Sequence, residues 1–191
     1  IVMERPAGDQ PWVQVSPVQT AANQEKVNEI VQEIQYARGR NFIDSPESLA
    51  DYGLDPASAR VTVVDSVGGN PQTFLFGNTG MVGEDGGVYV QRVGETGVFM
   101  IDGHILTLLP KSTNALRERR LMTQAAKDIT RLEYSGLGHT YTLVKDEKGT
   151  WKMIDPPLDD TDDQYVSNYI SALKMLEAAR FFPGTPAENG L

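Results

Sequence analysis

Five aspartates stand close together in the segment DPPLDDTDD, which covers residues 155–163. They are Asp155, Asp159, Asp160, Asp162 and Asp163. Carboxylates at this density suit a hard cation such as Ca²⁺, but the segment lacks the loop glycine and the distal glutamate of an EF-hand. Carboxylates ahead of a helix also cap its first turn and interact favourably with its dipole. We therefore predict that this acidic run caps a helix and binds no metal.

The two histidines, His104 and His139, are the side chains best suited to act as a general base. A histidine base needs a nearby nucleophile and an orienting carboxylate. Neither histidine lies in a nucleophile motif, and G-x-S-x-G and H-E-x-x-H do not occur. The absence of cysteine excludes thiol catalysis and disulfides. We predict no catalytic residue.

The glycine-rich stretch GNTGMVGEDGG, residues 77–87, lacks the lysine of a phosphate-binding P-loop. We predict a long hairpin loop there. With no other candidate motif, we predict no cofactor-binding residue and no cofactor.

Residues 111–131 differ in charge from the rest of the chain. Six basic residues stand against Glu118 and Asp128, a local net charge of +4 in a chain of net charge −9. The basic side chains either pair with the acidic remainder on a solvated helix or form a docking face for an acidic partner or an anionic lipid surface. Neighbouring helical residues point about 100° apart, so we expect Arg120 to pair internally. The possible interaction face consists of Lys111, Arg117, Arg119 and Lys127.

The elements that must position these residues follow from hydrophobic periodicity and turn formers. Strands are predicted over 1–5 and 12–15, followed by an amphipathic helix over roughly 22–37. A short helix begins at Ser45-Pro46 and ends at Gly53. Four strands, 60–66, 72–77, 87–93 and 97–102, form an antiparallel meander. Residues 103–125 are predicted to be helical with an interruption at Pro110, before strands 128–134, 139–145 and 151–155 and a helix over 162–178.

The pattern W-x-x-x-x-P occurs twice, 139 residues apart, at Trp12–Pro17 and at Trp151–Pro156. The same shift places Val27 on Val166, Phe42 on Phe181, and the apolar stripe of the first long helix on that of the second. We predict an internal strand–strand–helix repeat with copies at about 1–54 and 140–191 and the meander, 57–102, between them. Recurrence at equivalent places favours tryptophans that anchor a core over ligand platforms. The fold class is α+β, antiparallel sheets with packed helices, in a single domain over 1–191.

Composition limits the possible partners. Seventeen basic and 26 acidic side chains give an acidic protein that repels phosphate backbones, so nucleic acid is not an expected partner. No apolar run reaches the roughly 18–20 residues that span a bilayer. The chain begins at Ile1, which favours a segment upstream that is missing here.

Several short motifs in a fixed order resemble a bacterial family of domains of unknown function, DUF4340. These are the two W-x-x-x-x-P patterns, LADYGLDP (49–56), LFG (75–77), VYVQR (88–92) and LRERRL (116–121). The resemblance covers nearly the whole chain. It implies an N-terminal membrane helix that holds the domain outside the cytoplasm, and an association with ABC-transporter or gliding-motility proteins. It implies no established activity.

The function expected from residues and resemblance is that of a non-enzymatic, membrane-tethered accessory domain. It would dock a partner protein in or at a membrane. Two alternatives stay open. A small-ligand binding module would need an apolar cavity of a few hundred Å³ or more. A hydrolase acting on the cell envelope would need a pocket with perturbed titratable groups.

Overall fold

The structure is a computed structural model that describes residues 1–6, 9–65, 69–82 and 85–182. Its contacts divide the chain into two compact units, residues 1–118 and 119–191. Both contain antiparallel sheets and helices, so the predicted α+β class is confirmed. Within the described ranges, every helix is too short or too polar to cross a bilayer. That the whole chain acts as one extracytoplasmic-type domain stays a prediction.

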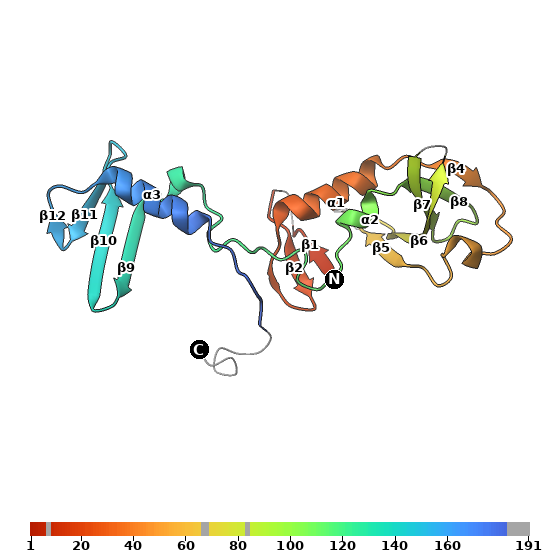
Figure 1. Ribbon diagram of the computed structural model, residues 1–191, viewed down its shortest axis with the longest axis horizontal. Coiled ribbons are helices and arrows are strands. Elements are labelled where there is room, and N and C mark those ends of the chain that lie inside the picture. Colours follow the sequence, from red (N-terminus) through yellow and green to blue (C-terminus); the bar gives the residue numbers. More distant parts are fainter. Residues whose placement is uncertain (7–8, 66–68, 83–84, 183–191) are drawn as a thin grey trace. The chain divides into compact units, whose positions relative to one another are not determined.

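The first unit opens with a small antiparallel sheet and a long helix (Figure 1). The sheet has the order β1-β2-β3, and helix α1 follows it; their bounds are β1 (Val2–Glu4), β2 (Val13–Ser16), β3 (Thr20–Ala21) and α1 (Gln24–Tyr36). Asn23 caps α1 by accepting the Lys26 N–H, and Val27 packs with Ala22 and Leu116. The two predicted strands and the helix are confirmed, whereas β3 was not predicted.

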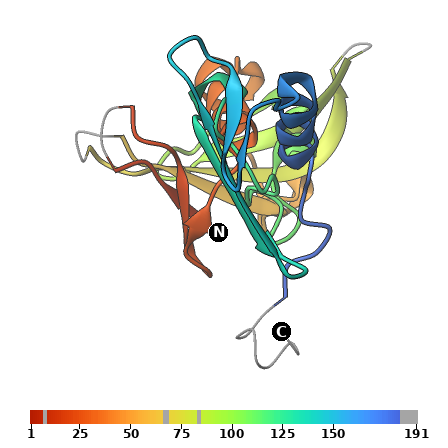
Figure 2. The ribbon, with the colours of Figure 1, turned by 90° about the vertical axis from the view of Figure 1, so that its left-hand side faces the viewer.

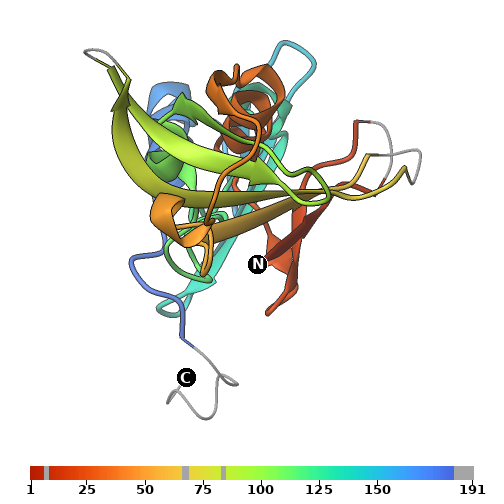
Figure 3. The same ribbon diagram turned by 90° about the vertical axis from the view of Figure 1, so that its right-hand side faces the viewer.

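The first unit continues into a strongly curved five-stranded sheet (Figure 3). Its order is β4-β8-β7-β6-β5, built from β4 (Arg40–Ile43), β5 (Ala59–Val63), β6 (Gln72–Val82), β7 (Asp85–Arg92) and β8 (Val98–Asp102). The predicted meander β5–β8 is confirmed, and β4 is an additional strand. The prediction of a long loop over 77–87 is wrong, because β6 continues to Val82 and β7 begins at Asp85; residues 83–84 lie outside the described residues. A Cβ at Gly87 would lie 2.9 Å from Met100 Cε, so this glycine permits close packing.

Two predicted helices are shorter than expected. Within 45–53 the helical part is a 3₁₀ turn, Ala50–Tyr52, which ends at Gly53 in the left-handed conformation with φ 67°. Within 103–125 it is α2 (Ile105–Leu108). The helix predicted beyond Pro110 is wrong, because the backbone there pairs with distant segments: Asn23 N–H donates to Leu116 O, and Glu118 N–H donates to Ala21 O.

The second unit has a four-stranded antiparallel sheet with a helix packed against it (Figure 2). The sheet order is β12-β11-β10-β9, with β9 (Arg131–Gly136), β10 (His139–Lys145), β11 (Trp151–Asp155), β12 (Pro157–Leu158) and α3 (Asp163–Lys174). A 3₁₀ turn, Ala126–Asp128, precedes β9. Trp151 and Leu143 from the sheet form a core with Val166 and Ile170 from α3. The three predicted strands are confirmed, and the predicted helix over 162–178 ends earlier, at Lys174.

Candidate functional site

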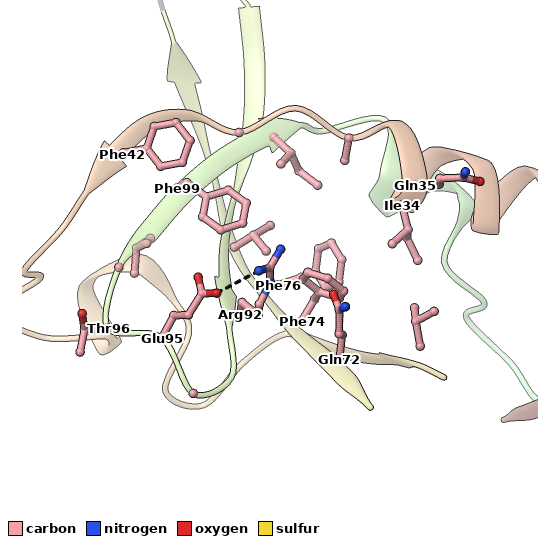
Figure 4. A pocket seen from close by; sticks show the side chains of 18 of the residues that line it. Ile34, Gln35, Phe42, Gln72, Phe74, Phe76, Arg92, Glu95, Thr96 and Phe99 are labelled. Carbon is pink, nitrogen blue, oxygen red and sulfur yellow. Dashed lines mark hydrogen bonds and ion pairs between the residues drawn. The ribbon is translucent and has the colours of Figure 1, made fainter. Parts of the chain in front are cut away.

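The concave face of the five-stranded sheet is covered at one end and open at the other. Phe76, Val88, Val90 and Ile101 alternate onto this face and pack against Ile105 of α2. Beyond this core the face opens into a pocket of about 1070 Å³ (Figure 4). This volume is slightly larger than the range typical of small-molecule sites, about 300–1,000 Å³.

The walls of the pocket are mainly apolar and carry four phenylalanines. Strands β6 and β8 supply Phe74, Phe76 and Phe99, and further lining residues come from α1 and from β4, which pairs with β8. The residues that α1 and β4 contribute are Val31, Ile34, Gln35, Phe42 and Ile43. Figure 4 shows Ile34 and the phenylalanine rings around the opening.

Phe42 is the most exposed of these rings. Its ring contacts that of Phe99, at 5.7 Å between ring centroids, and 68% of Phe42 remains exposed. Large apolar side chains exposed at the mouth of an apolar pocket are typical of a binding surface.

Charged groups line one side of the opening. The Arg92 guanidinium donates to the Glu95 carboxylate at 2.9 Å and lies 5.6 Å from the centre of the Phe74 ring. The turn between them contains Gly94, whose φ of 95° favours glycine. Asp44 follows β4, Asp65 follows β5, and both also line the pocket.

A structural cluster beneath the sheet joins three of the sequence motifs. The Tyr52 ring packs edge-on against Tyr89, with centroids 5.0 Å apart. A Cβ at Gly77 would overlap the carbonyl oxygen of Tyr52. LADYGLDP, LFG and VYVQR therefore meet at one place, which fixes the segment before β5 against β6 and β7.

Two of the predicted interaction residues lie in the first unit. Lys111 is exposed and lines a smaller pocket of about 310 Å³, together with Lys26 and Glu29 of α1. Arg117 is half-buried, and its guanidinium donates to Asn114 Oδ1 at 3.1 Å.

The other two lie in the second unit. Lys127 is exposed in the turn before β9. Arg119 is half-buried; its guanidinium donates to Ala179 O at 2.8 Å and lies 5.8 Å from the centre of the Phe181 ring. The helix assumed for these residues is absent, and a joint face of the four stays a prediction.

The acidic run and the histidines have local partners. Asp162 accepts the Tyr165 N–H at 2.9 Å and caps α3, so the predicted capping is confirmed for this residue. Asp163 accepts the Trp151 N–H at 2.7 Å. Among the residues that the structure describes, no group of three or more His, Cys, Asp or Glu is arranged to hold a metal ion. His104 contacts Thr107 Oγ1 at 3.3 Å, and His139 stacks on Tyr141 at 5.9 Å.

The pocket was not predicted from the sequence. The sequence feature that points toward the pocket is the alternation of aromatic residues at 74 and 76, which indicates an apolar strand face. That alternation does not say whether a helix covers the face.

The fold and the pocket define an α+β protein of two compact units, the first of which carries an open apolar pocket. The chain belongs to the family described as domain of unknown function (DUF4340), whose model matches residues 12–191. Comparison with curated proteins and with solved structures gave no match.

Proposed function

We propose that this chain is a non-enzymatic interaction domain that docks a partner protein through the apolar pocket of its first unit. The observation that carries the proposal is the exposed ring of Phe42 at the mouth of a cavity lined by further phenylalanines. Covering such surface is favourable by about 25 cal/mol per Å² of apolar area. A partner that brings apolar side chains to this opening gains that free energy.

The chemistry of the lining also supports binding over reaction. The ionisable residues that line the pocket are Asp44, Asp65, Arg92 and Glu95, and the guanidinium is paired with a carboxylate. Their arrangement suits orientation of a bound partner.

A photo-crosslinking amino acid placed at residue 42 tests the proposal in the native cell. Tyr165 provides the matched control, because it is an aromatic residue of similar exposure, 71%, on α3 of the second unit. We expect one defined adduct from position 42 and none of the same mass from position 165. Equal adducts from both positions, or none from position 42, contradict docking at this pocket.

A small-ligand binding module is the second candidate, and the pocket volume of about 1070 Å³ favours it. It predicts that native mass spectrometry of the purified chain detects a bound small molecule and that Phe99→Ala removes it. Detection of the apo mass alone, with no saturable binding of an apolar fluorescent probe, would contradict this candidate.

We also propose that the domain works outside the cytoplasm, tethered at a membrane near its partner. This proposal rests on family resemblance and on the exposure of Lys111 and Lys127. A basic residue near an anionic bilayer contributes about 1 kcal/mol, which salt screens. We expect sedimentation with anionic vesicles at low salt to fall in Lys111→Ala/Lys127→Ala. Sedimentation should be unchanged in the control Lys148→Ala/Lys174→Ala. If the wild type does not sediment with the vesicles, direct binding of the domain to anionic lipid is contradicted.

We further propose that the strand–strand–helix unit is duplicated. The Trp12 N–H donates to Gln24 Oε1 and the Trp151 N–H to Asp163 Oδ1, each at 2.7 Å and each 12 residues ahead. The caps Asn23 and Asp162 are also 139 residues apart. The matched contacts support a repeat whose copies lie in different compact units.

The two copies differ in detail. Gln14 pairs with Thr20 of β3, whereas Met153 pairs with Leu158 of β12, one position earlier than the shift of 139 requires. Val31 is exposed, whereas its counterpart Ile170 is buried. A crystal structure in which β1, β2 and α1 superpose on β10, β11 and α3 would support duplication, and a mismatch of strand direction would overturn it.

A further inference from the structure

We infer that the partner segment at this pocket is an extended, apolar peptide with basic flanks that adds to the sheet beside β5. This inference rests on the proposed docking function and names the chemistry of the occupant. It draws on three features of the first unit: a free sheet edge, the faces of the residues on that edge, and the charge of the pocket lining.

The free edge is strand β5. In the order β4-β8-β7-β6-β5 it has a neighbour on one side only, so alternate main-chain groups along it have no ladder partner among the residues that the structure describes. The pairing of β5 with β6 is regular over five residue pairs, from Ala59–Phe76 to Val63–Gln72. The other edge strand, β4, meets β8 at Arg40 and Ile43 with a shift in register between them, which makes it the poorer template.

The side chains of β5 connect this edge to the pocket. Val61 lies opposite Phe74, and Val63 itself lines the pocket. Because alternate residues of a strand share a face, a strand added beside β5 presents every second side chain to the pocket side. Main-chain hydrogen bonds then supply affinity, and the apolar pocket selects those alternate side chains.

The charge of the lining selects the flanks of the segment. The pocket lining contains three carboxylates, Asp44, Asp65 and Glu95, and one guanidinium, Arg92, which gives it a formal net charge of −2. Arg38 and Arg40 lie on the adjoining segment but do not line the pocket. An acidic rim on a chain of net charge −9 attracts lysine or arginine and repels the headgroup of a fatty acid or anionic lipid.

The probe is a fluorescein-labelled peptide of valines alternating with threonines between paired lysines. Only alternate amides of an edge-added strand face the sheet. One version of the peptide therefore carries N-methyl groups on the valine amides, and another carries them on the threonine amides. We expect one N-methylated version to lose more than about tenfold in affinity, because several hydrogen bonds are lost together, and the other to bind as the parent does.

Two changes test whether the acidic lining selects basic flanks. In the peptide the lysines are exchanged for glutamates, and in the protein the double variant is Asp44→Asn/Asp65→Asn. We expect the wild type to prefer the lysine peptide by about fivefold or more at low salt. The double variant should lose most of this preference. Asp159→Asn/Asp160→Asn, with the same charge change in the second unit, should keep it.

Each result decides a separate point. Equal binding of the two N-methylated peptides, or no detectable binding of the parent peptide, would overturn strand addition. Equal binding of lysine and glutamate peptides, or an equal effect of the control variant, would overturn the acidic-rim selection. Crosslinking from residue 42 tests the proposed docking function independently of the peptide experiments. The crosslink can therefore form even if the peptide experiments overturn strand addition or the acidic-rim selection.

Discussion

Gln14 is a polar residue in a position that suits an apolar one. It is completely buried in β2, and its Nε2 donates to Val18 O at 3.2 Å. Its Oε1 has no hydrogen-bond partner among the described residues. The residue 139 positions later is Met153, in β11, an inner strand of the second unit's sheet.

We therefore expect Gln14→Met to leave the free energy of unfolding unchanged or to raise it by about 1 kcal/mol. An unsatisfied buried acceptor costs about 1–3 kcal/mol, and the substitution removes it together with one hydrogen bond. Chemical denaturation measures the change, and Gln14→Glu should be strongly destabilising in the same assay. A loss of more than about 2 kcal/mol in Gln14→Met would show that Oε1 has a partner.

Gly77 is required where the backbone of the Tyr52 turn approaches β6. A methyl group there meets a carbonyl oxygen, which cannot move without displacing the turn. We expect Gly77→Ala to lower the free energy of unfolding by about 3 kcal/mol or more. Gly86→Ala is the control, because a Cβ there has nothing within 4 Å. Similar losses in the two variants would show that the close approach is unimportant.

Asp146 makes the turn between β10 and β11 sensitive to pH. The hydrogen bond from the Thr150 N–H lowers the pKa of Asp146 below its ordinary value of 3.8, and the Lys148 N–H and nearby Lys152 lower it further. A lowered pKa in the folded state means that the carboxylate stabilises the fold above pH 3.8. This contribution disappears as the pH falls through the folded-state pKa.

We expect a carboxyl NMR titration of Asp146 to have its midpoint below 3.8. In thermal unfolding, Asp146→Ala should lower the Tm more at about pH 7 than at a pH below the midpoint of that titration, where the wild-type carboxyl is protonated and uncharged. Equal Tm losses at both values would contradict the role of the charge.

At the scale of elements, β11 and α3 depend on Trp151. Its side chain is 2% exposed between the sheet and the helix, and its N–H bonds to the first residue of α3. We expect Trp151→Ala to cost about 3–5 kcal/mol of stability. Trp12→Ala should cost less, because Trp12 is only half-buried and its indole N–H reaches Asn28. Equal losses, or a loss under about 1 kcal/mol at Trp151, would contradict these roles.

Helices and strands with a regular hydrophobic pattern of their own were predictable from the sequence. The apolar spacing in α1 and α3 and the alternation in β5–β8 and β10 led to nearly correct boundaries. Residues 111–125 contain helix-forming residues, yet their backbone pairs with 21–23 in the first unit and with 176–178 in the second. Such non-local pairing overrides helix propensity, which is a weak effect per residue.

The candidate site was less predictable than its elements. Phe74 and Phe99 were correctly placed on strands, but Phe42 was not, because β4 is short and irregular. Whether a sheet face is covered depends on where α1 and α2 end relative to the strands, which local sequence does not determine. The basic residues show the converse: Arg117 and Arg119 suggested an exposed face but are half-buried.

At the scale of the whole molecule, each unit has its own core and one of the chain's two tryptophans. In the variant Trp151→Phe the remaining tryptophan is Trp12, so its fluorescence reports on the first unit. In the variant Trp12→Phe the remaining tryptophan is Trp151, so its fluorescence reports on the second unit. We expect Gly77→Ala to lower the denaturation midpoint seen by Trp12 and to leave that seen by Trp151 unchanged. Equal shifts in both would show that the chain unfolds as one cooperative unit.

The pairing of β4 with β8 also sets an order of assembly. Each hairpin of the β5–β8 meander closes a short loop, whereas the contact of Ile43 with Val98 closes the loop 44–97. Because long-range closure has the larger entropy cost, we expect the meander to form first and β4 to dock last. The same strand is then the first to detach in local opening, so its amides exchange with solvent faster than those of Val88 and Val90. We therefore expect the strand that carries Phe42 to open locally more often than the strands that carry Val88 and Val90.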